Sequence, residues 1–149
     1  MRFTLDTNVL VSAFIAKHGH SANLLELALT VESIELVLSR PILHELEDVL
    51  SRDEVRKRFS YSDRDIERIG KTLEKSSTII QVRSALKVVK DDPKDDTILN
   101  AALDGNADYI VSGDRHLLKL RRFRGIKIVK PKEMMDVISE KFPEFVLRL

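Results

Sequence analysis

Short apolar runs alternate with amphipathic stretches along almost the whole chain. Within the stretches, apolar side chains recur every three to four residues, which is the period of a helix. The runs that read as strands are Arg2–Asp6, Ile34–Leu38, Thr78–Val82, Leu86–Val89, Ala107–Ser112 and Ile126–Val129. Strands that alternate with helices favour a mainly parallel sheet that is covered on both faces. We therefore expect an α/β sandwich of three layers.

Capping residues mark where several of the helices begin. Ser39 with Pro41 and Asp92 with Pro93 are typical helix starts, because the polar side chain accepts from a free backbone N–H and proline needs none. The most charged region, Ser51–Ser77, predicts a pair of amphipathic helices. No repeat, low-complexity segment or linker interrupts the pattern, so we expect one domain over residues 1–149.

The composition excludes several functional classes. Of the 149 residues 43% are hydrophobic and 33% are charged, and no apolar stretch approaches the ~20 residues that span a membrane. The absence of cysteine excludes disulfides, thiolate catalysis and zinc–sulfur sites. The first residues lead directly into a strand with no signal-peptide pattern. We expect a cytoplasmic protein with no membrane partner.

Four acidic residues lie where predicted strands give way to helices. Asp6 ends the first strand, and Asp114 follows the strand around Tyr109. Glu45 lies in the helix after the second strand, and Asp96 lies in the first turn of a later helix. In open α/β sheets these positions converge on one crevice. Carboxylates that gather there repel one another, so the pattern indicates a hard divalent cation such as Mg²⁺ or Mn²⁺.

Most of these acids also have a local structural explanation. Asp114 is suited to cap the helix that follows it, and Glu45 competes with Glu47 and Asp48 on the same helix. Asp6 is hardest to explain in this way, because a carboxylate that ends a buried strand needs a partner, and the nearest basic residue in sequence, Arg2, is at the other end of that strand. The four acids together therefore favour a shared site.

Asp95 and Asp96 compete for one place in that site. Both lie in the first turn of their helix, where negative charge is favoured by the helix dipole. The apolar stripe of Ile98, Leu99 and Ala102 leaves both near the inward face, so periodicity does not separate them.

The chain resembles PIN-domain ribonucleases, above all the VapC-like toxins of toxin–antitoxin pairs. Nearly the whole chain takes part, through LDTNVLVSA, ILHELEDVL, DDPKDDTILNAALDGNADYIVSGDRHLL and IKIVKP. The resemblance implies an acidic quartet that holds Mg²⁺ or Mn²⁺ and hydrolyses RNA to products with 5′-phosphate and 3′-hydroxyl ends. On family spacing the quartet is Asp6, Glu45, Asp96 and Asp114. Asp6 and Asp114 are then the direct ligands, and Asn8, Asp95 and Ser112 lie beside them.

A run of basic residues begins next to Asp114. Between Arg115 and Lys132 there are eight Lys or Arg residues and no acid, although the net charge of the whole chain is only +1. Such a run attracts polyanions, although it is also a common kind of solvated surface. We expect RNA contacts from Arg115, Lys119, Arg121 and Arg122. The family resemblance further implies an antitoxin partner and a homodimer.

Two other functional classes remain open at this stage. A PIN-like domain that binds RNA or protein without cutting would keep the fold but lose the chemistry. A phosphoacceptor receiver domain also gathers acids around Mg²⁺, but it needs adjacent acids after the first strand, where this chain has Asp6-Thr7-Asn8. A metal-dependent endoribonuclease is the best interpretation of the residues.

Overall fold

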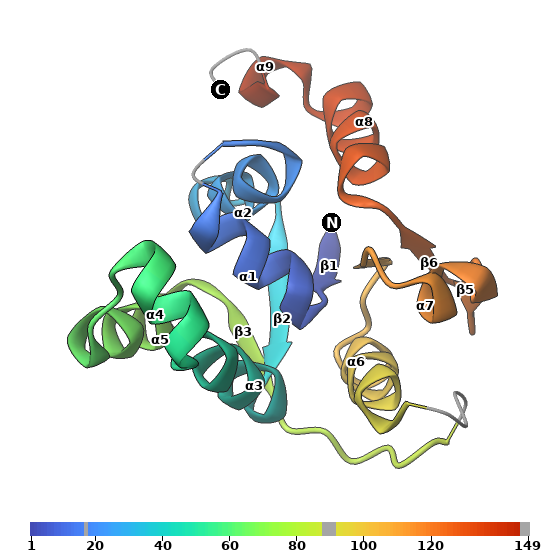
Figure 1. Ribbon diagram of the computed structural model, residues 1–149. Coiled ribbons are helices and arrows are strands. Elements are labelled where there is room, and N and C mark those ends of the chain that lie inside the picture. Colours follow the sequence, from blue (N-terminus) through green and yellow to red (C-terminus); the bar gives the residue numbers. More distant parts are fainter. Residues whose placement is uncertain (17, 88–91, 147–149) are drawn as a thin grey trace.

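The computed structural model describes residues 1–16, 18–87 and 92–146 (Figure 1). Its strands are β1 (Arg2–Leu5), β2 (Glu35–Ser39), β3 (Thr78–Ile80), β4 (Tyr109–Val111), β5 (Arg122–Phe123) and β6 (Ile126–Val129). Its helices are α1 (Thr7–Ile15), α2 (His20–Thr30), α3 (Arg40–Leu50), α4 (Asp53–Phe59), α5 (Asp63–Ser76), α6 (Pro93–Asp104), α7 (Arg115–Leu120), α8 (Pro131–Lys141) and α9 (Pro143–Val146).

The strands form one sheet in the order β3-β2-β1-β4-β6-β5, and all neighbours are parallel except β5 with β6. From β1 the chain moves outward to β2 and β3, then crosses back to continue on the other side of β1 with β4. The strand order therefore reverses between β1 and β4. In open α/β sheets, ligands bind in the crevice at the carboxyl ends of such a strand pair.

The helices form a layer on each face of the sheet, which confirms the expected sandwich. Helices α1 and α2 pack on each other, α3 lies along α1, and α8 lies along α2. Helix α6 instead contacts β1, β2 and β4. Right-handed crossovers that run in opposite directions along the sheet place their helices on opposite faces. The first turn of α6 thereby reaches the crevice between β1 and β4 from its own side.

The sheet is the centre of the hydrophobic core. Phe3 and Leu5 of β1 and Leu36 and Leu38 of β2 are fully buried, as expected for strands covered on both sides. Burying each such side chain contributes about 1.5–3 kcal/mol. This packing fixes the strand ends, and with them the residues that follow the strands.

Helix α6 approaches the sheet closely at its C-terminal end. A Cβ atom on Gly105 would lie 2.3 Å from Val37 Cγ1 and 3.0 Å from the carbonyl oxygen of Ala101. Only glycine fits at this contact, so its absent side chain lets α6 lie flat on β2.

The predicted helix starts at Ser39 and Asp92 are confirmed. The Ser39 side chain accepts from the N–H of Ile42, and the Asp92 side chain accepts from the N–H of Lys94. The charged pair in Ser51–Ser77 is confirmed as α4 and α5. Among the helices that the structure describes, none combines the length and the apolar character needed to cross a bilayer.

Several element boundaries differ from the sequence-based expectation: β2 lies one residue later than expected, and β3 and β4 are shorter. The first strand ends at Leu5, and β5 was not predicted. The run Leu86–Val89 lies partly outside the described residues, and its first two residues belong to no strand. Hydrogen bonds between the backbone of the described segment 83–86 and the side chains of Asn100 and Asp104 hold this segment on α6 instead. These side chains satisfy backbone groups that a neighbouring strand would otherwise satisfy.

Candidate metal centre

Two chain segments meet where β1 and β4 end. The backbone N–H of Asp6 donates to the carbonyl oxygen of Val111 at 2.9 Å, which extends the β1–β4 ladder by one bond beyond the strands. The Ser112 hydroxyl donates to Asp6 Oδ2 at 2.8 Å, and it accepts from the backbone N–H of Asp114 at 3.0 Å. A single buried hydroxyl therefore ties the Asp6 carboxylate to the segment that carries Asp114.

The start of α6 brings two further acids to the same place. One carboxylate oxygen each of Asp92, Asp95 and Asp114 lies within 4.8 Å of the others. Asp92 is the N-cap of α6, and Asp114 is the N-cap of α7 through a bond of 2.7 Å from the His116 N–H. Each cap accepts a helix N–H with one carboxylate oxygen, so the capping role is compatible with membership of the cluster.

Asp95 is the most unusual member of this cluster. It is only 3% exposed, and its Oδ2 has no hydrogen-bond partner among the described residues. Burial, followed by repulsion from Asp114, Asp92 and Asp6, raises the pKa of Asp95 to about 7, although nearby His116 acts in the opposite direction. A buried carboxylate without a partner is costly, and a cation at this point would supply one.

Asp6 is electrostatically part of the same group. Burial is the main effect that raises its pKa, with added repulsion from Asp114 and Glu45. The hydrogen bond from Ser112 and one from the backbone of Thr7 partly offset this rise. Although Asp6 occupies the N-cap position of α1, its side chain makes no capping bond. Its Oδ2 instead accepts from Ser112, which follows β4.

Glu45 approaches the group from α3. Its Oε2 accepts from the hydroxyl of buried Thr7 at 2.9 Å, and its Oε1 lies 3.4 Å from the ammonium of Lys94. Thr7 directly follows Asp6, so this bond fixes Glu45 relative to the end of β1. The ammonium is largely exposed to solvent, which makes the ion pair a weak one.

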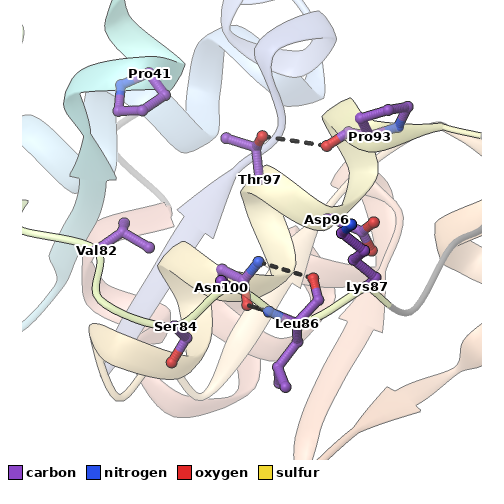
Figure 2. A pocket seen from close by; sticks show the side chains of 10 residues that line it. Pro41, Val82, Ser84, Leu86, Lys87, Pro93, Asp96, Thr97 and Asn100 are labelled. Atoms are coloured by element: carbon purple, nitrogen blue, oxygen red, sulfur yellow. Dashed lines mark hydrogen bonds between the residues drawn. The ribbon is translucent and has the colours of Figure 1, made fainter.

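The structure separates Asp95 from Asp96. Consecutive helical residues point roughly 100° apart, and Asp96 lines a different hollow of about 620 Å³ between α6 and the described residues 82–87. Figure 2 shows Asp96 and Lys87 among the residues that line this hollow, with the Asn100 amide bonded to the Leu86 backbone. Among the described residues, the acidic cluster thus contains Asp95, while Asp96 lies at the other hollow.

Two further predicted residues have contrasting environments. Ser112 is fully buried and forms the bridge described above, whereas Asn8 is exposed in the first turn of α1. The sequence interpretation treated Asp92 only as a cap and did not include Thr7 in the site. The sequence did contain a signal that Asp92 belongs to the site, because a cap residue lies at the same helix end as the acids of the first turn. Nothing in the sequence linked Thr7 or Lys94 to Glu45.

The predicted RNA contacts do not all lie together. Arg115, Lys119 and Arg121 line a hollow that begins at Gly113, directly before Asp114. Arg122 is exposed in β5 and is not among the residues that line it. Lys130 takes its place in the lining.

Comparison with known proteins agrees with this fold. The model of a family described as "PIN domain" matches residues 2–116. Among solved structures, the crystal structure of VapBC2 from Rickettsia felis bound to a DNA fragment from their promoter matches with a TM-score of 0.59 and 18% identity. That match covers 86% of this chain and 97% of the other. No curated protein matches the sequence.

Proposed function

We propose that this chain, which belongs to the PIN-domain family, is a divalent-metal-dependent endoribonuclease. The observation that carries the proposal is Asp95, a buried carboxylate with one oxygen unpartnered among the described residues. That carboxylate lies in a crevice with Asp92 and Asp114, where the strand order of a parallel sheet reverses. Family membership makes nuclease chemistry the expected use of such a site.

The donor set fits a hard divalent ion. Every candidate ligand is a carboxylate oxygen, the ligand type that suits Mg²⁺ and Mn²⁺, and the chain has no cysteine to favour a softer metal. We assign Asp6, Asp95 and Asp114 as the residues that hold the ion, with Asp92 and Glu45 beside it. Ser112 orients Asp6 through its hydrogen bond, as outer-shell partners orient ligands in other metal sites.

The proposed reaction is hydrolysis of an RNA phosphodiester. The oxygen of a water forms a bond to phosphorus, the bond from phosphorus to the 3′ oxygen breaks, and that oxygen takes a proton. The products are a 5′-phosphate and a 3′-hydroxyl. A bound divalent ion supplies charge neutralisation and a more acidic water. We assign Glu45, held by Thr7 and accessible from solvent, to accept a hydrogen bond from the attacking water.

We further propose that the chain is the toxin of a toxin–antitoxin pair, that it forms a homodimer and that a protein antitoxin blocks it. The similarity in fold to VapBC2 supports this assignment. The receiver-domain alternative is not supported, because the strand order here differs from the 2-1-3-4-5 order of flavodoxin-like folds. This proposal is tested by expressing the chain alone and together with the product of the adjacent gene. Growth should arrest only when the chain is expressed alone.

The nuclease proposal is tested with purified protein, a mixed RNA pool and Mn²⁺ or Mg²⁺. Cleavage is expected with either metal and should stop with EDTA. Asp95→Asn should abolish cleavage while the circular dichroism spectrum stays unchanged. Asp96→Asn is the matched control, since its side chain lines the other hollow, and it should cut at the wild-type rate. Equal cleavage by Asp95→Asn would overturn the proposal, and RNA binding without any cleavage would favour a non-catalytic PIN-like domain.

A further inference from the structure

We propose that the hollow beside Asp114 is a binding groove for the RNA backbone on one side of the cut. This inference rests on the proposed ribonuclease function and deepens it. The groove has a volume of about 670 Å³ and begins at Gly113. Cationic side chains that come from α7 and from the ends of two neighbouring segments line it: Arg115, Lys119, Arg121 and Lys130.

The groove and the acidic centre are formed by adjacent residues of the chain. Gly113 forms part of its wall, and Asp114, the next residue, belongs to the cluster with Asp92 and Asp95. His116 also lines the groove and is close enough to act electrostatically on Asp95. We therefore infer that a strand in the groove extends toward the carboxylates.

The fold separates two groups of side chains within the basic run. Lys130 follows β6, so the groove lies at the carboxyl ends of β4 and β6. Arg124 and Lys127 line another hollow together with Asp108, at the opposite ends of the same two strands. Only the first group lies at the end of the sheet where the acids gather. The position of these charges, rather than their number, therefore indicates a function.

An RNA strand fits this arrangement better than an acidic peptide. Its phosphates repeat along the backbone, so several can pair with the groove while another lies at the acidic centre. On the other side of the centre, the hollow around Glu45 contains Asp48 as well as Arg52 and Lys94. That mixed charge offers a polyanion much less attraction. We therefore infer that the strand is held mainly on the α7 side.

The test measures binding without cleavage. In an Asp6→Asn background, a fluorescent oligouridylate is titrated with the groove variant Lys119→Glu/Lys130→Glu and with the control variant Arg124→Glu/Lys127→Glu. Each pair changes the net charge equally, and all four side chains are exposed. Each neutralised phosphate contributes about 0.7 to the slope of log affinity against log salt for a single strand. The groove variant should thus lose about 1.4 of slope, while the control keeps its slope and affinity.

Equal losses of affinity and slope in both variants, or no loss in either, would overturn the proposed binding groove. Polyglutamate that competes as strongly as oligouridylate at equal charge would also overturn it, because the site would then read charge alone. The outcome is separable from the nuclease proposal. If the groove variant lowers RNA binding but the wild type does not cleave RNA, only the nuclease proposal is rejected. If the wild type cleaves RNA but the groove variant binds RNA as tightly as the control, only the groove proposal is rejected.

Discussion

The Ser112 hydroxyl donates to Asp6 Oδ2 at 2.8 Å and so connects residues that are 106 positions apart in the sequence. The same oxygen accepts from the backbone N–H of Asp114. One side chain thus sets the relative positions of two proposed metal ligands. Ser112 is fully buried at the carboxyl ends of β1 and β4, whereas Asp6 and Asp114 are half-buried.

Replacing Ser112 by alanine should weaken metal binding without unfolding the protein. Asp6 would lose the hydrogen bond that favours its ionised form, and the Asp114 N–H would lose its acceptor. Loss of such an outer-shell partner typically costs about 10–100-fold in metal affinity. Isothermal titration with Mn²⁺ measures this change, and Ser112→Thr, which keeps the hydroxyl, is the control. Wild-type affinity in Ser112→Ala would contradict the bridging role.

Thr7→Val should slow RNA cleavage while leaving the affinity for metal nearly unchanged. The substitution keeps the shape of a buried side chain but removes the hydrogen bond that orients Glu45. We expect a decrease of at least about tenfold in the cleavage rate, as for other positioning partners. Single-turnover kinetics measures it, and Thr72→Val on the exposed side of α5 is the control. If both variants cut equally fast, Glu45 does not depend on Thr7.

The raised pKa of Asp95 predicts that the stability of the metal-free protein depends on pH. Its pKa is about 7 in the folded chain against an ordinary value of 3.8. Folding therefore opposes its ionisation, and the stability that it contributes below pH 3.8 is lost as the pH rises to about 7. The slope is about 1.4 kcal/mol per pH unit within this window, or at most on the order of 4 kcal/mol in total.

Urea unfolding at a series of pH values isolates this effect when wild type is compared with Asp95→Asn. The free energy of unfolding of the variant should increase relative to that of wild type between pH 4 and pH 7. Mn²⁺ should reduce this difference by neutralising Asp95 in the wild type. Glu35, Asp65 and Asp104 have lowered pKa values and act in the opposite direction, but they are the same in both proteins. A difference that does not vary with pH would contradict the raised pKa.

Gly105→Ala should destabilise the fold. The added methyl group would overlap Val37 Cγ1 at 2.3 Å, where α6 meets β2, and overpacking of this kind costs typically about 1–3 kcal/mol. Gly113→Ala is the matched control, because a Cβ there meets nothing within 4 Å. Thermal unfolding followed by circular dichroism compares the two variants. Equal midpoints would show that α6 shifts without cost.

The alternation of strands and helices was enough to predict the sandwich, because each buried strand is a short apolar run of its own. Ser39 and Asp92 marked helix starts correctly for local reasons that act within one turn. The two-residue β5 escaped prediction because its pairing with β6 depends on positive φ angles at Arg124 and Gly125 rather than on an apolar pattern.

The acidic site was harder to predict in detail than the fold. Asp6 and Asp114 follow strands whose ends the sheet fixes, so their meeting follows from topology. Asp95 and Asp96 differ only by the rotation of α6 about its own axis, and that rotation is set by contacts such as Gly105 with Val37 far along the helix. The bond from Thr7 to Glu45 joins residues 38 positions apart, and no local pattern records it.

Asp114 serves two structural purposes at once, which affects how its mutants must be interpreted. One oxygen holds the first turn of α7, while the carboxylate also contributes its charge to the crevice. Alanine would remove the charge and release the short helix that carries Arg115 and Lys119, so lost activity would have two mixed causes. Asparagine is itself a good helix cap. Asp114→Asn therefore withdraws the negative charge alone and is the informative substitution.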